Sequence, residues 1–341
     1  MNQDWQTFLS SQHAHINDGV VAHFGDQGAE LKHTASSTVL CDLSQYGLLR
    51  ASGEEAQGFL QNLLSNDIRF VDATHAQLSS FNTAKGRMLA VFTIWRDGED
   101  YLLQLPSSIL EALRKKLSMY VLRTKVKISD ASNEFVSLGL SGKDAATLLS
   151  RISPELPQEV MGCVNHASVH IMKLGATRFQ LTTSLDQAQT LWNVLSKDAR
   201  PVGSVCWDSL NVRAGIPSIV PKTQEEFVPQ MANLDALGGI NFKKGCYPGQ
   251  EIVARMHYLG KLKRRMYLAH LDGSEAPQPG DELFSDDMEG QASGMIANVA
   301  PAPEGGYDVL AVIQTASVEG YKLRTANNTE LNILPLPYTL A

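Results

Sequence analysis

Hydrophobic residues along the chain recur with two periods, one typical of strands and one typical of helices. A short apolar strand over 48–51 is followed by a helical spacing of three or four residues at Phe59, Leu60, Leu63 and Leu64. A β-rich run over 88–95, the turn pair Asp97-Gly98 and a return strand over 101–105 then predict a hairpin. This succession of strand, helix and hairpin indicates an α+β domain whose helices cover one face of an antiparallel sheet.

Two further helices are indicated by the residues at their ends. Ser108 and Glu111 have the spacing of a capping box, so a helix is expected after the hairpin as far as about Met119. A helix over 204–213 is expected to stop at Gly215, because glycine readily takes the left-handed conformation that ends helices.

The order of elements then repeats, and the second copy begins 89 positions further along the chain. The pair Ser141-Gly142 follows a predicted strand over 135–140, just as Ser52-Gly53 follows the first strand. A strand over 178–184 with its helix echoes the return strand of the first hairpin with its helix. Because two separate elements agree in the same order, the sequence predicts a pair of α+β domains.

The pattern of predicted elements changes beyond Arg264: short β runs alternate with Pro- and Gly-rich turns, as is typical of a small all-β barrel or sandwich. By contrast, the first forty residues are polar, contain four His and show little periodicity. The predicted domains are an N-terminal extension, partly irregular, over 1–40, a region of two α+β domains over 41–262, and a C-terminal antiparallel β-barrel over 263–341.

Composition places the chain among ordinary globular proteins. Its 341 residues, 43% of them hydrophobic, suffice for two or three domains. A net charge of −7 argues against a surface built throughout to coat nucleic acid. No uncharged apolar run is long enough to span a bilayer, and the first residues lack the basic start and apolar stretch of a signal peptide. A cytoplasmic location without membrane contact is therefore expected.

The chain has four isolated cysteines, at Cys41, Cys163, Cys206 and Cys246. None has a second Cys or a His at ligand spacing, so no metal site is predicted, and three of the four are expected to be small core residues. Cys246 differs because residues 238–249 contain four Gly and one Pro. Lysines precede it and a helix is expected to begin near Gln250; both favour thiolate over thiol. A reactive Cys246 and a tight turn with a buried, inert Cys are both open.

Basic residues are concentrated around this loop. Seven cations stand against Glu251 as the one acid, namely Lys243, Lys244, Arg255, Lys261, Lys263, Arg264 and Arg265. Such a concentration suits an anionic ligand or an RNA backbone. A solvated face, balanced by acids elsewhere in the chain, is the alternative interpretation.

The loop resembles that of the folate-binding YgfZ-type proteins, which are relatives of the glycine-cleavage T-protein, an aminomethyltransferase. The motif K-G-C-Y-x-G-Q-E is present over 244–251 and is flanked by matching residues over 227–240 and 253–255. Weaker similarity covers nearly the whole chain, including the Lys85-Gly86-Arg87 loop and the segment 214–217.

The resemblance implies a fold and a function. The implied fold has two α+β domains, ferredoxin-like and T-protein-like, and a C-terminal β-barrel, arranged around a central folate cavity. The implied cofactor is tetrahydrofolate or a folate derivative. The implied role is to support iron–sulfur cluster assembly or repair and iron–sulfur-dependent tRNA methylthiolation. Partners would be iron–sulfur enzymes such as tRNA methylthiotransferases, with a weak tRNA contact through the basic patch.

The resemblance also implies which residues carry this function. Cys246 corresponds to the reactive Cys of the motif, and Tyr46 and Trp207 are the aromatic residues expected around the folate. Aromatic faces of this kind can sandwich a flat pterin while a Lys or Arg meets the glutamate tail. The full set expected to bind the cofactor is Tyr46, Trp207, Lys85, Arg87, Arg213, Lys244, Gly245, Tyr247, Gly249, Gln250, Glu251 and Arg255.

Two departures from the T-protein pattern concern catalysis. Leu89 or Ala90 stands where the T-protein has an Asp that acts in its folate chemistry, and an apolar side chain cannot act as an acid or base. Arg213 stands where the T-protein has a Glu that grips the pterin. Aminomethyl transfer is therefore not expected. A folate-dependent one-carbon transferase, and a module that docks tRNA or a partner beside a vestigial folate cleft, remain as alternatives.

Overall fold

The computed structural model describes residues 1–260 and 262–340. The chain forms two compact units, each assembled from separate stretches of sequence. Unit 1 comprises Met1–Ala56, Phe70–Gln77 and Ile94–Trp207. Unit 2 comprises Gln57–Arg69, Leu78–Thr93 and Asp208–Ala341. The predicted division at residues 40 and 262 stays a prediction.

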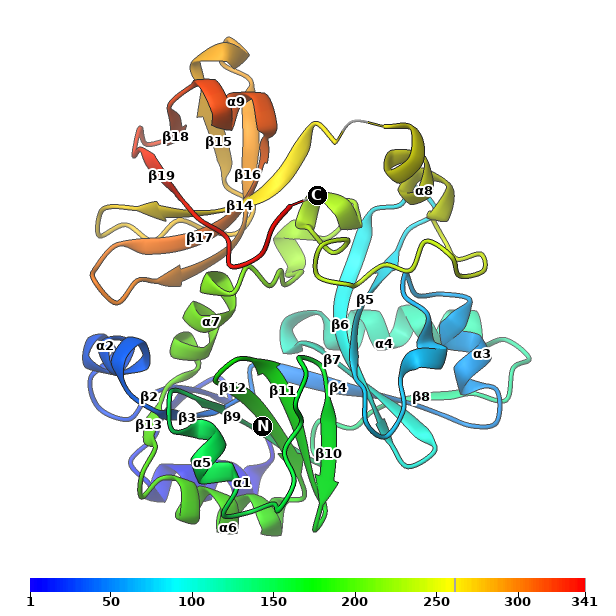
Figure 1. Ribbon diagram of the computed structural model, residues 1–341, viewed down its shortest axis with the longest axis vertical. Helices are drawn as coiled ribbons and strands as arrows, with labels where there is room; N and C mark the ends of the chain where they lie inside the picture. Colours follow the sequence, from blue (N-terminus) through cyan, green and yellow to red (C-terminus); the bar gives the residue numbers. More distant parts are fainter. Residues whose placement is uncertain (261, 341) are drawn as a thin grey trace. The chain divides into compact units, whose positions relative to one another are not determined.

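A six-stranded sheet forms the core of unit 1 (Figure 1). Its strands, in spatial order, are β10 (Cys163–His166), β11 (Val169–Gly175), β12 (Arg178–Thr183), β9 (Val136–Ser141), β3 (Val39–Asp42) and β13 (Arg200–Val202). All neighbours are antiparallel except β13, which pairs with β3 in parallel.

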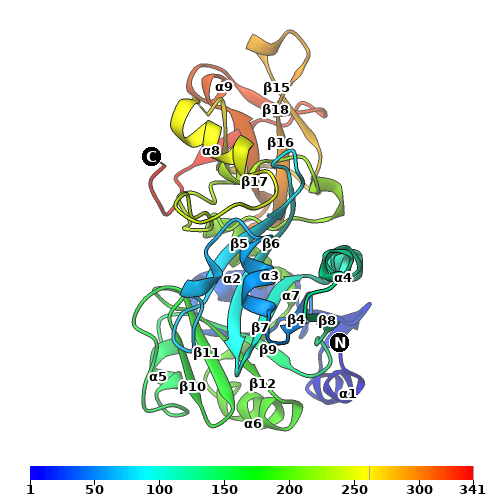
Figure 2. The same cartoon turned by 90° about the vertical axis from the view of Figure 1, so that its right-hand side faces the viewer.

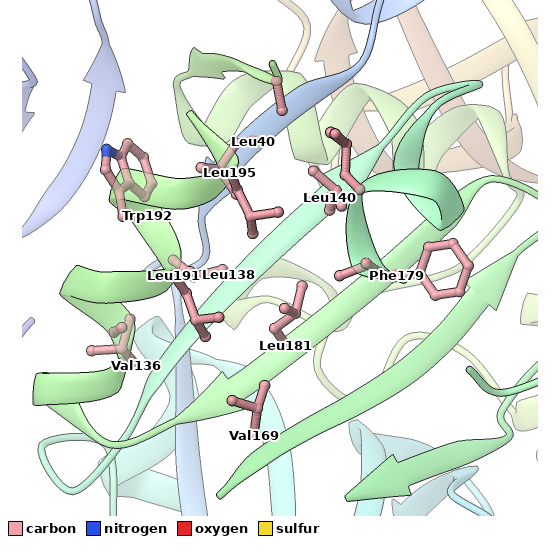
Figure 3. Packing of buried hydrophobic residues seen from close by; sticks show 14 of the residues in the cluster. Leu40, Val136, Leu138, Leu140, Val169, Phe179, Leu181, Leu191, Trp192 and Leu195 are labelled. Carbon is pink, nitrogen blue, oxygen red and sulfur yellow. The ribbon is translucent and has the colours of Figure 1, made fainter. Parts of the chain in front are cut away.

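Three helices supply the apolar residues that cover one face of this sheet. They are α1 (Gln3–Ser11), α5 (Ala145–Leu149) and α6 (Leu185–Leu195). Strand residues such as Leu138 and Leu181 alternate inward and meet Leu191 and Trp192 of α6 (Figure 3). Because strand side chains alternate between faces, the opposite face carries Arg178, Gln180 and other polar residues of β12.

A second sheet has five strands and follows the same plan. Its strands, in spatial order, are β5 (Gln77–Asn82), β6 (Met88–Asp97), β7 (Asp100–Pro106), β4 (Tyr46–Ser52) and β8 (Lys127–Asp130). Its helices are α3 (Ala56–Gln61) and α4 (Ser107–Val121). The order β6-β7-β4 matches β11-β12-β9 of the first sheet, which confirms the predicted repeat.

Glycine has the same role in both halves of the repeat. Gly53 and Gly142 follow β4 and β9 and have φ of +111° and +133°, which side chains rarely adopt. A Cβ on Gly53 would lie 2.2 Å from the Lys125 carbonyl oxygen, and one on Gly142 would lie 2.4 Å from the Thr38 Cα. The Ser-Gly pairs therefore mark equivalent strand-to-helix junctions.

The C-terminal residues form a curled antiparallel sheet, a half-barrel within unit 2 (Figure 2). Its strands, in spatial order, are β18 (Leu323–Thr325), β15 (Glu282–Ser285), β16 (Ala292–Pro301), β17 (Tyr307–Gln314), β14 (Arg264–Leu271) and β19 (Leu331–Leu334). One isolated bridge, Arg324 to Glu330, connects the edge strand β18 to the residue before β19. A short helix, α9 (Thr315–Gly320), follows β17.

The remaining elements connect these sheets. They are the ribbon β1 (His15–Asn17) and β2 (Val20–His23), the helices α2 (Gln27–Ser36), α7 (Ser204–Arg213) and α8 (Gln250–Leu259), and the 3-10 turns η1 (Ile68–Phe70), η2 (Pro221–Thr223), η3 (Pro229–Ala232) and η4 (Asp286–Met288). None of the helices within the described ranges is both long and apolar enough to cross a membrane.

Two local predictions are wrong. The first forty residues are ordered rather than partly irregular, because Trp5 and Leu9 of α1 are buried in the core and the Trp5 indole N–H donates to Asp42 at 2.7 Å. The capping box at Ser108 is absent: α4 begins one residue earlier, after Pro106, and has no side-chain cap. The helix over 204–213 has the predicted ends.

Candidate functional site

The motif loop leads into α8 through a glycine that no other residue could replace without strain. Gly249 precedes the helix with a φ of +79°. A Cβ on Gly249 would lie 2.4 Å from the Cα of Gly86, which has a φ of +72° itself. The Lys85-Gly86-Arg87 turn and the motif loop therefore pack backbone to backbone within unit 2, as only glycines allow.

Lys244 fastens the loop to the segment that follows α3. Its side chain is 6% exposed, and Nζ donates to the carbonyl oxygens of Gln61, Leu64 and Asn66 at 2.7, 2.6 and 2.9 Å. Burial lowers the pKa of Lys244 to about 8. Since an ammonium has three protons to donate, all its hydrogen bonds are used inside the protein. Lys244 thus acts as an anchor of the loop.

The same segment bonds to the start of the loop. The Ser65 hydroxyl donates to the Gly239 carbonyl at 2.7 Å, and the Asn66 amide donates to the Gly238 carbonyl at 2.8 Å. Tyr247 is buried, with its ring centre 5.2 Å from the Lys244 Nζ, within range of a cation–π contact. The residues on either side of Cys246 are thereby fixed at several points.

Cys246 itself is exposed, so its interpretation as a buried Cys is wrong. Cys41, Cys163 and Cys206 are buried, as predicted. Burial raises the pKa of the Cys163 thiol to about 12. The loop therefore presents one accessible sulfur on a fixed backbone. In the described part of the chain, no three His, Cys, Asp or Glu side chains are grouped in a way that could hold a metal ion.

Several other residues predicted to bind the cofactor lie at the surface of unit 2. Lys85, Gly245, Glu251 and Arg255 are exposed, and the Gln250 amide donates weakly to the Lys244 carbonyl at 3.4 Å. Arg87 donates to the carbonyl oxygen of Glu226.

Arg213 forms an ion pair within unit 2. Its Nε donates to Asp308, whose carboxylate is fully buried and also bonds His270 Nδ1 at 2.9 Å. A buried carboxylate requires a positive partner. This pairing gives a physical reason for an Arg at the position where the T-protein pattern has a Glu.

Tyr46 and Trp207 both belong to unit 1. Trp207 is 2% exposed and rests on Gly139 of β9, where a Cβ would lie 2.5 Å from the ring. Tyr46 begins β4, is half-buried, and lines a small cavity of about 80 Å3. Sequence reasoning missed Arg178, which lies beside the Trp207 ring. Arg178, Gln180 and Thr182 alternate with apolar residues, which is the pattern of a strand with one face toward solvent. The pattern gives no sign that this polar face is also buried.

Fewer of the seven basic residues are available at the surface than the sequence predicts. Lys244 is buried, and Arg265 bonds Asp235 at 2.6 Å. Lys261 lies outside the described residues. Three exposed cations and one half-buried cation remain among the described residues, namely Lys243, Arg255, Lys263 and Arg264.

Aromatic residues alternate with these cations along this segment of the chain. The rings of Phe242 and His257 stack with centres 3.7 Å apart, and Tyr258, which is 64% exposed, meets both rings edge-on. A basic surface with accessible rings is typical of proteins that bind single-stranded nucleic acid.

Comparison with known proteins identifies the family. A family model for the GCVT N-terminal domain matches residues 21–242. Proteins from Escherichia fergusonii, Shigella boydii and Escherichia coli, each named tRNA-modifying protein YgfZ, are 31% identical over 306 residues, which are 88% of this chain and 93% of the relatives. The chain belongs to the YgfZ family. The resemblance carried by the motif over 244–251 is thereby confirmed.

The fold of this YgfZ family member is also that of the T-protein. The crystal structure of glycine cleavage system aminomethyltransferase T from Bartonella henselae matches it with a TM-score of 0.81 at 19% identity, over 99% of this chain and 97% of that one. The mixed α+β fold is confirmed. The central cavity and the arrangement of domains around it stay predictions.

Proposed function

We propose that this chain is a tetrahydrofolate-binding accessory protein that supports iron–sulfur-dependent tRNA modification, with Cys246 as its reactive group. Its relatives carry the name tRNA-modifying protein, which supports the role in tRNA modification. The single observation that carries the role of Cys246 is an exposed thiol on a loop anchored by Lys244 and by the contact of Gly86 with Gly249.

The residues of unit 1 suit a reduced folate chemically. Tyr46 and Trp207 supply aromatic rings, and Arg178 has unpartnered donors beside Trp207. A flat heterocycle with a carboxylate tail needs both kinds of group. When bound, the folate would supply a carrier of one-carbon units, while the protein residues bind and orient it. Leu89 and Ala90 stand where an acid is needed for aminomethyl transfer, and their apolar side chains argue against the transferase alternative.

Replacement of Cys246 tests this function. We expect Cys246→Ala to fold as the wild type does, because the side chain is exposed, and to fail to restore tRNA methylthiolation in a strain that lacks this gene. Modified nucleosides in total tRNA, measured by mass spectrometry, give the readout. Cys163→Ala is the matched control, since its thiol is buried, and it should restore the modification. Full restoration by Cys246→Ala would remove Cys246 from the mechanism.

A second function, docking of tRNA, is favoured by a separate observation. Lys243 is exposed and follows Phe242 in the chain, and Arg255 is exposed on α8, the helix that also carries His257, whose ring stacks on Phe242. Cations neutralise phosphates and rings stack on unpaired bases, so this surface of unit 2 suits a single-stranded region of tRNA. The two functions are compatible, because tRNA is the substrate of the modification that the chain would support.

A further inference from the structure

Arg178 is a buried arginine whose two terminal amino groups have no partner. Arg178 is the first residue of β12 and is 6% exposed, and neither its Nη1 nor its Nη2 forms a hydrogen bond with any described residue. Among the described residues, Tyr46 is near enough to raise the pKa of Arg178, and no carboxylate contributes. Burial lowers the pKa of Arg178 to about 10, so the guanidinium keeps its proton at neutral pH.

A buried guanidinium without acceptors is unfavourable, because it has lost the hydrogen bonds that water provides. Arg50, on the neighbouring sheet, shows the usual arrangement: it bonds the carboxylates of Asp97, Asp100 and Glu134 at 2.8 to 3.0 Å. Arg178 has no equivalent partners. An unpaired charge in such a place is typical of a binding site whose ligand supplies the acceptor.

The surroundings of Arg178 fix its position. Its Cζ lies 5.3 Å from the centre of the Trp207 ring, within range of cation–π attraction. The indole can approach the sheet this closely because Gly139 has no side chain. Trp207 and Gly139 therefore restrict where the guanidinium can lie.

Another buried donor in unit 1 also has no partner. The residue Gln104 of β7 is 7% exposed, and its Nε2 makes no hydrogen bond to any described residue. Gln104 and Tyr46 line the same small cavity, and Tyr46 is also near enough to Arg178 to affect its pKa. Since the groups without partners are donors, the missing ligand atoms are acceptors.

We propose that Arg178 binds a planar pair of acceptor atoms on the ligand and so determines which ligand the chain selects. The fork of a guanidinium matches two parallel acceptors, as in a carboxylate. A reduced folate offers acceptors in two places, the paired oxygens of its glutamyl carboxylates and the O4 carbonyl of its pterin ring, whose two lone pairs lie in the ring plane. The inference rests on the proposed function, because it names the residue that selects the folate.

Calorimetric titration of the full chain with three probes tests the proposal. The probes are tetrahydrofolate, p-aminobenzoyl-glutamate, which has the tail alone, and 6-methyltetrahydropterin, which has the ring alone. We expect Arg178→Met to weaken tetrahydrofolate binding by about 10- to 100-fold, the range for a hydrogen bond to a charged group. If the tail is the partner, the variant also loses p-aminobenzoyl-glutamate and keeps the pterin; if the ring is the partner, the reverse holds. Arg200→Met, at an exposed position on β13, is the control and should bind all probes as the wild type does.

Stability without ligand gives an independent readout. Because Met removes a buried charge that has no partner, ligand-free Arg178→Met should unfold at a higher urea midpoint than the wild type. A lower midpoint would mean that the guanidinium is satisfied within the protein, and would overturn the proposal. Equal affinity of variant and wild type for tetrahydrofolate would overturn it too, with the proposed function intact. If the wild type binds no folate, the proposed function fails, and a raised midpoint then retains Arg178 as a site for another acceptor.

Discussion

At the scale of single residues, two adjacent lysines at the start of the motif differ in burial. Lys244 is buried and donates to three carbonyl oxygens, whereas its neighbour Lys243 is exposed. Both are expected from the sequence to act through their charge on Cys246 or on an anion. Burial separates them: Lys244 holds the backbone, and Lys243 is available to a ligand at the surface.

The pair offers a direct test of this division. We expect Lys244→Met to lower the free energy of unfolding by roughly 3 kcal/mol, because three carbonyl groups lose a charged donor and remain buried. Lys243→Met is the matched control and should change it by less than about 0.5 kcal/mol, as is usual at an exposed site. Urea denaturation gives both values. Equal stability of the two variants would show that the three bonds contribute nothing net.

His170 gives unit 1 a dependence on pH. It is 8% exposed, stacks on Trp95 with ring centres 5.6 Å apart, and burial lowers its pKa to about 4. The unfolded chain binds this proton near pH 6.5 and the folded chain only near pH 4. The stabilising contribution is therefore complete above pH 6.5 and is lost as the pH falls to 4, at most about 3 kcal/mol.

A variant that keeps the ring and removes the proton site isolates this effect. His170→Phe should match the wild type at pH 7 and exceed its unfolding free energy by about 2 kcal/mol at pH 4.5. His166→Phe, on the adjacent strand β10, should retain the wild-type profile. Urea denaturation at several pH values measures both. Parallel curves for His170→Phe and the wild type would mean that His170 titrates normally in the folded chain.

At the scale of elements, local signals predicted most of the fold. The helix 204–213, the hairpin around Asp97-Gly98 and the strands beyond 264 are set by caps, turns and alternation within a few residues. The helix α1 was missed because it has few apolar positions, yet Asn2 caps it through bonds to the Asp4 and Trp5 amides. Its stability depends on Trp5 packing into a core formed by distant strands, which local periodicity does not reveal.

The candidate site, like the fold, was predictable from the sequence only where the signal is local. Glycines and lysines of the motif are visible in sequence, and the exposed Cys246 agrees with the reactive alternative. The anchoring role of Lys244 and the ion pair of Arg213 with Asp308 were not predictable, since their partners lie about 180 and 95 positions away. The unpaired state of Arg178 was hidden for a related reason, because burial of a polar strand face is a tertiary property.

At the scale of the whole molecule, the compact units do not follow the sequence order. Residues 57–69 and 78–93 belong with 208–341, bound through contacts such as the Met88 amide to the Phe227 carbonyl at 2.8 Å. A change in the pattern of predicted elements along the chain can mark the half-barrel, but it cannot assign these two short segments to unit 2. The Cys246 loop consequently takes its support from residues far from it in sequence.

The charge of the whole molecule bears on the tRNA contact. A chain of net charge −7 repels a polyanion at long range, so binding must depend on the few local cations, Lys243, Arg255, Lys263 and Arg264. Each phosphate neutralised steepens the decrease of log Ka with log salt by about 0.7 to 0.9. We expect the slope for total tRNA to lie near −3 to −4 and to become shallower by nearly 2 in the double variant Lys243→Ala, Arg255→Ala.

The double variant Lys197→Ala, Arg200→Ala removes the same charge from exposed positions of unit 1 and should leave the slope unchanged. Filter binding across 50 to 200 mM salt measures all three slopes. The same loss of slope in both double variants would mean that net charge, rather than this surface, governs the contact, and the docking function would then have no site.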